Sequence, residues 1–300
     1  MNKRILITGG SGFIGRSLVE YFSNRTFFPL KKSVWAPTSS ELDLLDSEKV
    51  SEYLRKHKFD VIIHAATYDA IPEFSTKEEL KQLENNIRMF FNIVRAKPFF
   101  GKMIYFGSGA VYNRKDLKPK MKEEYFGESI PGDQYGFSKY VMANYTMKSD
   151  FIYNLRLFGV FGKFDDWRYR FISNACCKAA LGLPITIKQN VFFDYLYMDD
   201  LAKIVEWFID NNPKERVFNT CSGETVDYLS LAEKIVSISS KSLDIVVEKK
   251  GLRQEYSGDN SLLKKNMNSF KPTSLDDSLK ELYEWYVENK NIIDLKRFIY

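Results

Sequence analysis

The stretch RILITGGSGFIG, residues 4–15, decides the fold of this chain. A short β-branched run leads into the spacing G-x-x-G-x-x-G, and the segment SLVEYF that follows has helical spacing. Glycines 9, 12 and 15 would let the backbone of a strand-to-helix turn approach a pyrophosphate, to which the helix N-terminus would offer unpaired N–H groups. Because the glycines lie between a strand and a helix, they predict a dinucleotide-binding loop rather than a plain turn.

Strand and helix patterns alternate through the first part of the chain. Continuous apolar runs predict strands, and amphipathic segments between them predict helices. The expected strands cover 4–8, 33–37, 60–66, 102–108 and 151–158, and the expected helices cover 46–58, 77–97 and 134–148. This alternation predicts an α/β fold, with a Rossmann-type doubly wound parallel sheet.

The pattern loosens after about Gly162. Helices are expected near 169–181, 199–211, 228–239 and 275–289, with short strands at 184–187 and 217–219. No repeat or low-complexity linker marks a boundary between the two parts. We therefore expect a dinucleotide-binding domain over 1–162 and a smaller, interwoven C-terminal substrate lobe over 163–300, with some segments returning to the sheet.

The composition is ordinary for a globular chain, with 300 residues, 44% hydrophobic and 28% charged. No apolar run approaches the ~20 residues of a membrane span, and the N-terminal apolar stretch is too short for a signal peptide. Three cysteines and two histidines form no disulfide or metal pattern, so we expect no metal and a cytoplasmic location. The net charge of +5 is spread along the chain, so neither a nucleic acid nor a membrane is an expected partner.

The residues after the second expected strand bear on the choice of cofactor. NAD-binding chains usually carry a carboxylate there, which bonds the ribose hydroxyls. Here residues 36–38 are Ala-Pro-Thr, so no acidic side chain would repel a 2′-phosphate, and Ser39, Ser40 or Lys31 could help to hold one. Arg16, just after the last glycine, is a further candidate cation. NADP(H) is therefore favoured, and NAD(H) stays open.

The segment YGFSK, residues 135–139, suggests catalysis. Tyr135 and Lys139 are four residues apart, so on a helix they share one face. An ammonium near a phenol favours the phenolate and brings its pKa closer to neutral pH, which suits proton transfer. Ser108 ends an expected strand at the carboxyl edge of the sheet, where ligands bind in such folds. Its hydroxyl could bond a substrate oxygen beside Tyr135.

Five motifs, in this order, make the chain resemble the short-chain dehydrogenase/reductase superfamily, in its extended, nucleotide-sugar-modifying branch. They are TGGSGFIG (8–15), DVIIHAAT (60–67), ENNIRMFFNIVRA (84–96), NLRLFGVFG (154–162) and FDYLYMDDLAK (193–203). The segment 218–235 is similar as well, so the resemblance covers nearly the whole chain.

The resemblance implies a mechanism. Tyr135 would transfer a proton to or from a sugar oxygen while a hydride moves to or from the nicotinamide. Lys139 would lower the pKa of Tyr135 and bond the nicotinamide ribose, and Ser108 would orient the sugar oxygen and stabilise its charge. Asp43 lies where a loop could reach the adenine, with helix capping as its alternative role. The expected cofactor-binding residues are Gly9, Ser11, Gly12, Phe13, Ile14, Gly15, Arg16, Asp43, Leu44, His64, Ala65, Ala66, Asn86, Tyr135 and Lys139.

The residues that follow Ser108 narrow the choice among the reactions of this family. Gly109 and Ala110 stand where sugar 4,6-dehydratases need an acid–base pair, so dehydration is disfavoured. The best fit is to reductases resembling GDP-fucose synthase, but Ala110 replaces the Cys of that enzyme's epimerisation step, and Arg168 or a neighbour replaces the His. Ser-Tyr-Lys alone suffices to reduce a 4-keto sugar, or to epimerise C4 through a transient ketone. The neutral residues at 36–38 favour the NADPH-dependent reductase over an NAD-dependent epimerase.

The substrate side departs from the resemblance at two positions. Phe193 replaces an arginine that would bind the diphosphate, and Gly159 replaces the usual asparagine. Arg253 matches a second phosphate-binding arginine and could compensate, whereas Arg170 and Lys178 are expected on solvated helix faces. The expected substrate-binding residues are Ser108, Ala110, Arg168 and Arg253.

The expected partner is a nucleotide-diphosphate sugar. The resemblance also suggests a homodimer packed through the helix that carries Tyr135 and the helix before it. A reading from another class is a non-catalytic NAD(P)-binding regulator or RNA-binding relative. The joint presence of Ser108, Tyr135 and Lys139 argues against it, because a non-enzyme has no need of all three.

Overall fold

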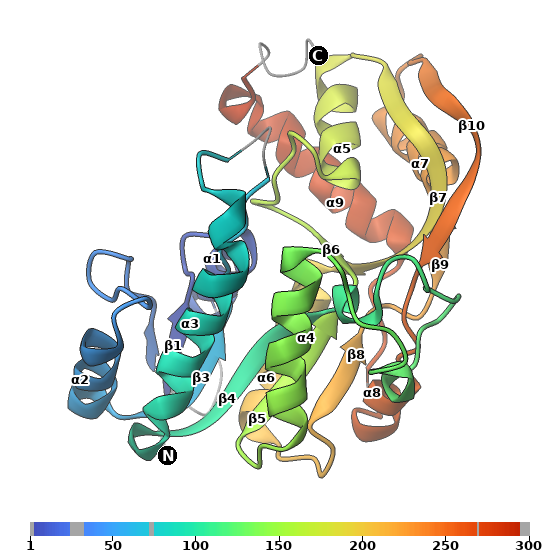
Figure 1. Cartoon of the computed structure of the whole chain (residues 1–300). Helices are drawn as coiled ribbons and strands as arrows, with labels where there is room; N and C mark the ends of the chain where they lie inside the picture. Colours follow the sequence, from blue (N-terminus) through green and yellow to red (C-terminus); the bar gives the residue numbers. More distant parts are fainter. Residues whose placement is uncertain (1–2, 25–32, 72–74, 269, 295–300) are drawn as a thin grey trace.

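A six-stranded parallel sheet, in the order β2-β1-β3-β4-β5-β8, forms the centre of the computed structural model, which describes residues 3–24, 33–71, 75–268 and 270–294 (Figure 1). The strands are β1 (Arg4–Thr8), β2 (Ser33–Trp35), β3 (Phe59–His64), β4 (Phe100–Ser108), β5 (Ile152–Leu157) and β8 (Val217–Thr220). Every pair in this sheet is parallel. The predicted Rossmann-type fold class is thereby confirmed.

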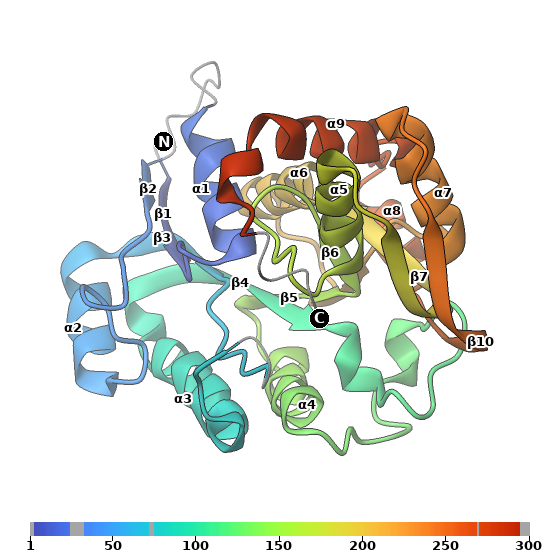
Figure 2. The ribbon, with the colours of Figure 1, turned by 90° about the horizontal axis from the view of Figure 1, so that it is seen from above.

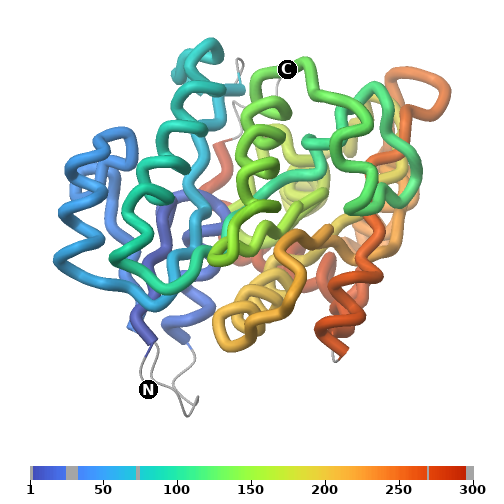
Figure 3. The backbone as a smooth tube through the Cα atoms, turned by 60° about the horizontal axis from the view of Figure 1, so that its bottom comes forward, coloured from blue at the N-terminus to red at the C-terminus, as the bar shows by residue number. Residues whose placement is uncertain are grey.

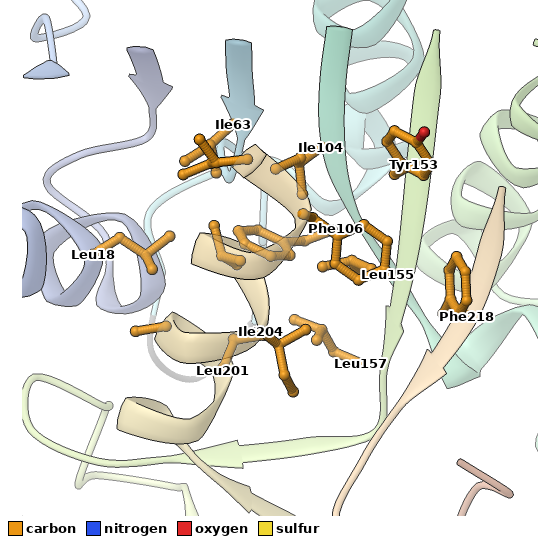
Figure 4. Close-up of a cluster of buried hydrophobic side chains, with 14 of the residues drawn as sticks. Leu18, Ile63, Ile104, Phe106, Tyr153, Leu155, Leu157, Leu201, Ile204 and Phe218 are labelled. Atoms are coloured by element: carbon orange, nitrogen blue, oxygen red, sulfur yellow. The ribbon is translucent and has the colours of Figure 1, made fainter. Parts of the chain in front are cut away.

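Helices cover both faces of this sheet (Figure 2). One face carries α1 (Phe13–Ser23) and α6 (Met198–Asp210), and the other carries α2 (Ser47–His57), α3 (Gln82–Arg95) and α4 (Gln134–Met147). Alternate strand residues point to opposite faces, so Ile5 and Ile7 of β1 join the first core and Leu6 joins the second. In Figure 4, Leu201 and Ile204 of α6 lie against the strands within the first core.

A second sheet, in the order β10-β7-β6, belongs to the C-terminal lobe. Its strands are β6 (Gly159–Phe161), β7 (Ile185–Tyr197) and β10 (Ile245–Tyr256), and β9 (Thr225–Asp227) pairs antiparallel with β7. Three helices pack together over its apolar side: α5 (Phe171–Leu181), α7 (Tyr228–Ser239) and α9 (Leu275–Glu288). The helix α8 (Ser261–Asn266) lies beside β8 of the first sheet.

The long strands of this lobe differ most from the sequence prediction. The expected strand at 184–187 is only the start of the thirteen-residue β7, and β10 was not expected. Most β10 residues are exposed, so the strand lacks the apolar alternation by which strands are detected. The β10–β7 register shifts twice, between Lys249 and Leu252 and between Arg253 and Tyr256.

Helices α3 and α4 run side by side, as the teal and green coils of Figure 3 show. The short 3₁₀ segments are η1 (Glu79–Lys81), η2 (Lys97–Phe99), η3 (Gly109–Tyr112), η4 (Glu123–Tyr125) and η5 (Lys290–Ile292). Among the described residues, no helix is long and apolar enough to cross a membrane. The same residues contain no cluster of three or more His, Cys, Asp or Glu side chains suited to a metal ion.

Candidate active site

A cavity of about 770 Å³ lies where the carboxyl edge of the six-stranded sheet meets the C-terminal lobe. Its wall on the sheet side includes the start of α1 and the ends of β3, β4 and β5. Its opposite wall comes from β7, β10 and the segment that leads into α5. Ligands bind at the carboxyl ends of the strands in open α/β sheets, so this cavity is the candidate active site.

The glycine turn forms a tight cradle at the start of α1. Gly9 has φ +72°, and a Cβ there would lie 2.7 Å from the Ala66 Cα. A Cβ on Gly15 would lie 2.1 Å from the Gly9 carbonyl oxygen, so the helix can approach the turn only with glycine at this position. Gly12, the N-cap residue, has no side chain to cap the helix, and the first turn carries no acidic residue. Such an uncapped helix start fits a pyrophosphate.

The other residues predicted in the turn lie around this cradle. Phe13 and Ile14 line the cavity directly. Ser11 is exposed just before the helix. The guanidinium of Arg16 lies 3.8 Å from the centre of the Phe164 ring, in the loop after β6. Its observed contact is therefore with the segment that follows β6, and not with the residues after β2.

The end of β3 supplies another part of the sheet-side wall. His64, Ala65 and Ala66 line the cavity. The His64 Nδ1 atom lies 2.9 Å from the Thr8 hydroxyl, and burial, with a smaller effect of the Lys139 charge, lowers the histidine pKa to about 3. His64 is therefore a neutral wall residue at physiological pH.

Asn86 acts behind this wall. Its side-chain oxygen accepts a hydrogen bond of 2.8 Å from the Tyr68 backbone N–H, and its amide nitrogen donates to the Tyr68 carbonyl at 3.0 Å. The residue is buried in α3 and holds the loop that follows β3. The structure thus gives Asn86 a positioning role for this loop.

Ser108, Tyr135 and Lys139 line this one cavity. Ser108 ends β4, and its hydroxyl oxygen accepts a 3.1 Å hydrogen bond from the Ala110 backbone N–H. Asp133 caps α4 by accepting from the Gly136 backbone N–H at 2.8 Å, which fixes Tyr135 in the first turn of the helix.

Lys139 lies one helical turn beyond Tyr135. Its ammonium donates to the Phe106 carbonyl at 3.0 Å and lies 5.7 Å from the centre of the Tyr135 ring. Burial lowers the pKa of Lys139 to about 8, and the charge of Asp69 opposes this shift. The predicted arrangement of phenol and ammonium on one helix face is present.

The pKa of Tyr135 differs from the expectation. It is raised, because burial disfavours the phenolate more than hydrogen bonding from Ser108 favours it. The ammonium of Lys139 is engaged with a backbone carbonyl, and it does not bring the phenol toward neutral pH. Tyr135 consequently keeps its proton at physiological pH and can act as a proton donor.

Comparison with known proteins identifies the family. A family model described as the NAD dependent epimerase/dehydratase family matches residues 5–221. The chain belongs to this family. GDP-L-colitose synthase of Yersinia pseudotuberculosis is 24% identical to it, over 96% of this chain and 99% of that protein. These matches confirm the resemblance to nucleotide-sugar-modifying enzymes.

Solved structures share the fold of this family member. A GDP-L-fucose synthetase from Naegleria fowleri superimposes with a TM-score of 0.83 at 18% identity, covering 96% of this chain and 94% of that one. A GDP-mannoheptose C4 reductase from Campylobacter jejuni with NADP bound gives a TM-score of 0.77 at 21% identity, covering 95% and 98%. The chain is thus an NAD(P)-dependent enzyme of the nucleotide-sugar epimerase, dehydratase and reductase family.

Two predicted substrate residues lie outside the cavity wall of this family member. Ala110 is buried in η3, behind Ser108. Arg168 pairs with Asp166, only two residues away, which keeps its guanidinium on the loop before α5. Arg170, which was expected on a solvated helix face, is the exposed N-cap residue of α5, and it also lines the cavity, together with the predicted Arg253.

Two predicted cofactor-binding residues, Asp43 and Leu44, also lie away from the cavity wall. Leu44 is buried in the core beneath α3, where its carbonyl accepts from the Asn92 side chain at 2.9 Å. Asp43 is exposed, and its carboxylate accepts from the Leu45 backbone N–H at 2.9 Å. The helix-capping alternative for Asp43 is not seen, since Asp46 caps α2.

The turn after β2 contains a polar cluster beside the glycine cradle. A Cβ on Gly10 would lie 2.9 Å from the Ala36 Cβ, so the two turns are in contact. The Glu41 carboxylate accepts from the Thr38 backbone N–H at 2.8 Å and from its hydroxyl at 2.9 Å, and Ser40 lies 2.8 Å from that hydroxyl. Of the candidate phosphate-binding residues, Lys31 is outside the described part of the chain.

Several cavity residues were missed by the sequence analysis. Arg114 lies on the loop after η3, and Asp69 follows β3. Asp165 is a buried carboxyl whose pKa is raised by burial to about 6, with the charge of Arg170, 3.9 Å away, opposing the shift. Tyr256 comes from the unexpected strand β10. None of these residues stands in a short local motif, so only the tertiary fold brings them together.

The two departures on the substrate side lie beside one another. A Cβ on Gly159 would lie 2.7 Å from the Phe193 ring and 2.7 Å from the Asp194 carbonyl oxygen, so a side chain and the backbone both occupy the space that a side chain at 159 would need. The Phe193 ring lies 4.7 Å from the Tyr195 ring and 4.9 Å from the Tyr256 ring. An aromatic surface therefore stands where the resemblance places an arginine.

Proposed function

We propose that this chain catalyses the NADPH-dependent reduction of the 4-keto group of a nucleotide-linked 6-deoxy sugar. One observation carries the proposal: Ser108, Tyr135 and Lys139 line the same cavity as the start of α1. Burial raises the pKa of Tyr135, and a phenol that holds its proton is suited to protonate a carbonyl oxygen. Reduction of a ketone needs such a proton donor.

The glycine turn 9–15 and the start of α1 would hold the pyrophosphate of NADPH, and 64–66 would flank its nicotinamide half. When bound, NADPH supplies the hydride. Tyr135 would donate its phenol proton to the sugar 4-oxygen, and the Ser108 hydroxyl would hydrogen-bond that oxygen as negative charge develops on it. Lys139 would offer a positive charge to the ribose side.

The substrate proposal rests on three cations. Arg114, Arg170 and Arg253 line the cavity, and guanidinium groups suit the oxygens of a diphosphate. Gly109 and Ala110 cannot transfer a proton, so the residues after Ser108 do not support dehydration. The relatives with GDP-sugar names make a GDP-linked sugar the first substrate to try.

The cofactor preference has support on both sides. Ala36 lies against the glycine turn, and residues 36–38 carry no acidic side chain, which favours a 2′-phosphate. Glu41 lies three residues beyond Thr38, which donates two hydrogen bonds to one of its carboxylate oxygens. A carboxylate after the second strand favours NAD, because it can bind the ribose hydroxyls. This carboxylate is the observation that keeps a second candidate function, an NAD-dependent nucleotide-sugar 4-epimerase.

The deciding experiment supplies the purified protein with GDP- and dTDP-linked 4-keto-6-deoxy sugars. The proposal predicts oxidation of NADPH at 340 nm only when a 4-keto sugar is present, with NADH less effective. The Tyr135→Phe variant is the control for contaminating reductases. Interconversion of unreduced 4-epimers by protein that retains bound NAD would instead establish the epimerase. Absence of both activities, with nucleic-acid binding, would support the non-catalytic alternative.

We also propose that the protein is a cytoplasmic homodimer that packs through α3 and α4. Phe137, Tyr145 and Met147 of α4 are exposed apolar residues, and Leu80 just before α3 is 82% exposed. Such a patch favours a partner surface. Light scattering should give twice the mass of the chain, and Phe137→Glu should shift it toward the monomer.

A further inference from the structure

A phenol at the start of α7 lies in the cavity wall, and the proposed reaction does not use it. Tyr228 is the first residue of α7 and lines the cavity. Asp227 caps this helix, because its carboxylate accepts from the Leu229 backbone N–H at 3.1 Å. The Asn190 side chain of β7 donates to that carboxylate at 2.9 Å and accepts from the same backbone N–H at 3.2 Å. The start of α7, and Tyr228 with it, is thereby fixed against β7.

Aromatic neighbours hold the ring of Tyr228. It stacks on the Phe171 ring of α5, with the ring centres 4.0 Å apart and an interplanar angle of 3°. The centre of the Phe193 ring of β7 lies 6.2 Å from its own, at an angle of 32°. These contacts involve the rings and not the hydroxyl, so a phenylalanine at 228 would keep them.

The hydroxyl oxygen of Tyr228 accepts a hydrogen bond from Tyr195, whose hydroxyl donates to it at 3.2 Å. Tyr195 stands two residues after Phe193 on β7, so these two side chains share one face of the strand. A phenol carries one proton, and Tyr228 does not use its own in this bond. Within residues 3–24, 33–71, 75–268 and 270–294, which the structure describes, no acceptor takes that proton. The O–H of Tyr228 is therefore available to a ligand in the cavity that this residue lines.

The surroundings of Tyr228 suit an anionic ligand. Arg253 lines the same cavity and pairs with Val191 of β7, the residue after Asn190. The phenol and this guanidinium are thus held at neighbouring positions of β7. Phe193, which stands where the resemblance places a phosphate-binding arginine, lies beside the Tyr228 ring. Phosphate oxygens accept hydrogen bonds from guanidinium groups and from tyrosine hydroxyls, so both donors fit a diphosphate.

We propose that Tyr228 binds the diphosphate of the sugar nucleotide by donating its phenol proton to a phosphate oxygen. A hydrogen bond to a charged oxygen is stronger than one between neutral groups. The hydrogen bond from Tyr195 polarises the Tyr228 O–H and makes it a better donor. The two tyrosines together supply a neutral contact beside Phe193, which brings no charge. This inference rests on the proposed function, because it takes a nucleotide-diphosphate sugar as the substrate.

Binding of a nucleoside diphosphate tests the proposal without turnover. Isothermal titration calorimetry with GDP and with dTDP should give a Kd about tenfold higher for Tyr228→Phe than for the wild type. Tyr195→Phe should raise this Kd about threefold, because it removes the polarising bond but leaves the donor. The double variant should match Tyr228→Phe within about twofold, since Tyr195 acts only through Tyr228. In the reductase assay, Tyr228→Phe should raise the KM for the sugar nucleotide about tenfold and leave kcat within about twofold.

Tyr153→Phe is the matched control. The Tyr153 hydroxyl donates to the Pro213 carbonyl at 3.2 Å, away from the cavity lining, so this variant should leave the Kd for GDP unchanged. Each variant should keep the wild-type melting temperature within a few degrees. An unchanged Kd for GDP and dTDP in Tyr228→Phe would overturn the proposal, and so would a wild type that binds neither nucleotide. If Tyr228→Phe lost affinity only for a GDP-linked hexose and not for GDP, the phenol would contact the sugar, and the assignment to phosphate would be wrong.

The binding assay separates this inference from the proposed function. If the wild type oxidised no NADPH with any 4-keto sugar, the proposed function would fail. A loss of GDP affinity of about tenfold in Tyr228→Phe would still establish the contact with phosphate. If the wild type reduced a 4-keto sugar and Tyr228→Phe left the KM for that sugar nucleotide unchanged, the proposed function would stand and this inference would be wrong.

Discussion

The two walls of the cavity are built differently. On the sheet side, the part of the wall next to the glycine turn 9–15 is packed closely on backbone: Ala65 and Ala66 line the cavity, and a Cβ on Gly9 would lie 2.7 Å from the Ala66 Cα. The wall from β7 and β10 presents large side chains, including Phe193 and Tyr256. The first wall leaves no room for a larger side chain. The second wall consists of side chains, so a substitution there changes the surface of the cavity.

This difference indicates how each wall can change. A methyl group on Gly15 would overlap a backbone carbonyl, which cannot move without the turn. On the other wall, a Cβ on Gly159 would meet the Phe193 ring, which is a side chain, at 2.7 Å, and the Asp194 carbonyl oxygen at 2.7 Å. The binding of a dinucleotide is therefore tied to the backbone, while the choice of substrate depends on side chains. The following predictions test this contrast, in decreasing order of expected effect.

Tyr135→Phe should give the largest loss. Removing the proton donor should lower kcat about 10³-fold, within the 10²–10⁴ range of general acid–base catalysis. The cofactor Kd, measured by quenching of protein fluorescence, should stay within about twofold, because the cradle of α1 is untouched. A comparable loss of cofactor affinity would contradict the assignment of Tyr135 to proton transfer and of the α1 cradle to cofactor binding.

Gly15→Ala should weaken cofactor binding at least about tenfold. Its Cβ would lie 2.1 Å from the Gly9 carbonyl oxygen, so the turn must open and lose its fit to a pyrophosphate. The matched control is Gly132→Ala, since a Cβ on Gly132 meets nothing within 4 Å. Isothermal titration calorimetry would measure the affinity of both variants for NADPH. Equal affinities would show that a Cβ at position 15 does not prevent the turn from binding the cofactor.

Substitution of an arginine that lines the cavity should affect KM more than substitution of an arginine outside it. Arg253→Gln should raise the KM for the sugar nucleotide about tenfold, because it removes a charged contact from the cavity. Arg168→Gln should change KM less than twofold, because its guanidinium pairs with Asp166 outside the cavity. The reverse order of effects would favour the sequence-based assignment of Arg168.

The pH dependence should be the mildest effect. Burial lowers the pKa of Lys139 to about 8, so the ammonium is present below that pH and is lost as pH rises through it. If its charge assists the reaction, kcat/KM should fall about fourfold between pH 7 and 8.5. A rise across this window, measured in a buffer of constant ionic strength, would show that the neutral amine is the active form.

The sequence predicted those parts of the site that depend on local constraints. The glycine turn follows from backbone conformation, and the spacing of Tyr135 and Lys139 follows from the helix period. The end of β4 at Ser108 follows from a continuous apolar run. Each of these signals lies within a few neighbouring residues.

The remaining parts depend on pairing between distant segments. Tyr256 reaches the cavity because β10 pairs with β7, but β10 is mostly exposed and resembles a polar loop in sequence. Arg168 and Arg170 are two residues apart, and only the loop before α5 decides which of them enters the cavity. The family resemblance assigned Asn86 to the cofactor site. Its contact with the loop after β3, where it accepts from the Tyr68 backbone N–H, is visible only in three dimensions.

The register shift near the end of β10 determines how the cavity would respond to the deletion of a single residue. Arg253 and Tyr256 are separated by an odd number of positions, so in a regular strand they would face opposite sides. Three residues of β10 span the distance that two residues of β7 cover between Val191 and Phe193, and with this surplus residue both Arg253 and Tyr256 line the cavity. Deleting a single residue between 253 and 256 would turn either the guanidinium or the phenol outward, although every chemically active group of the chain would still be encoded.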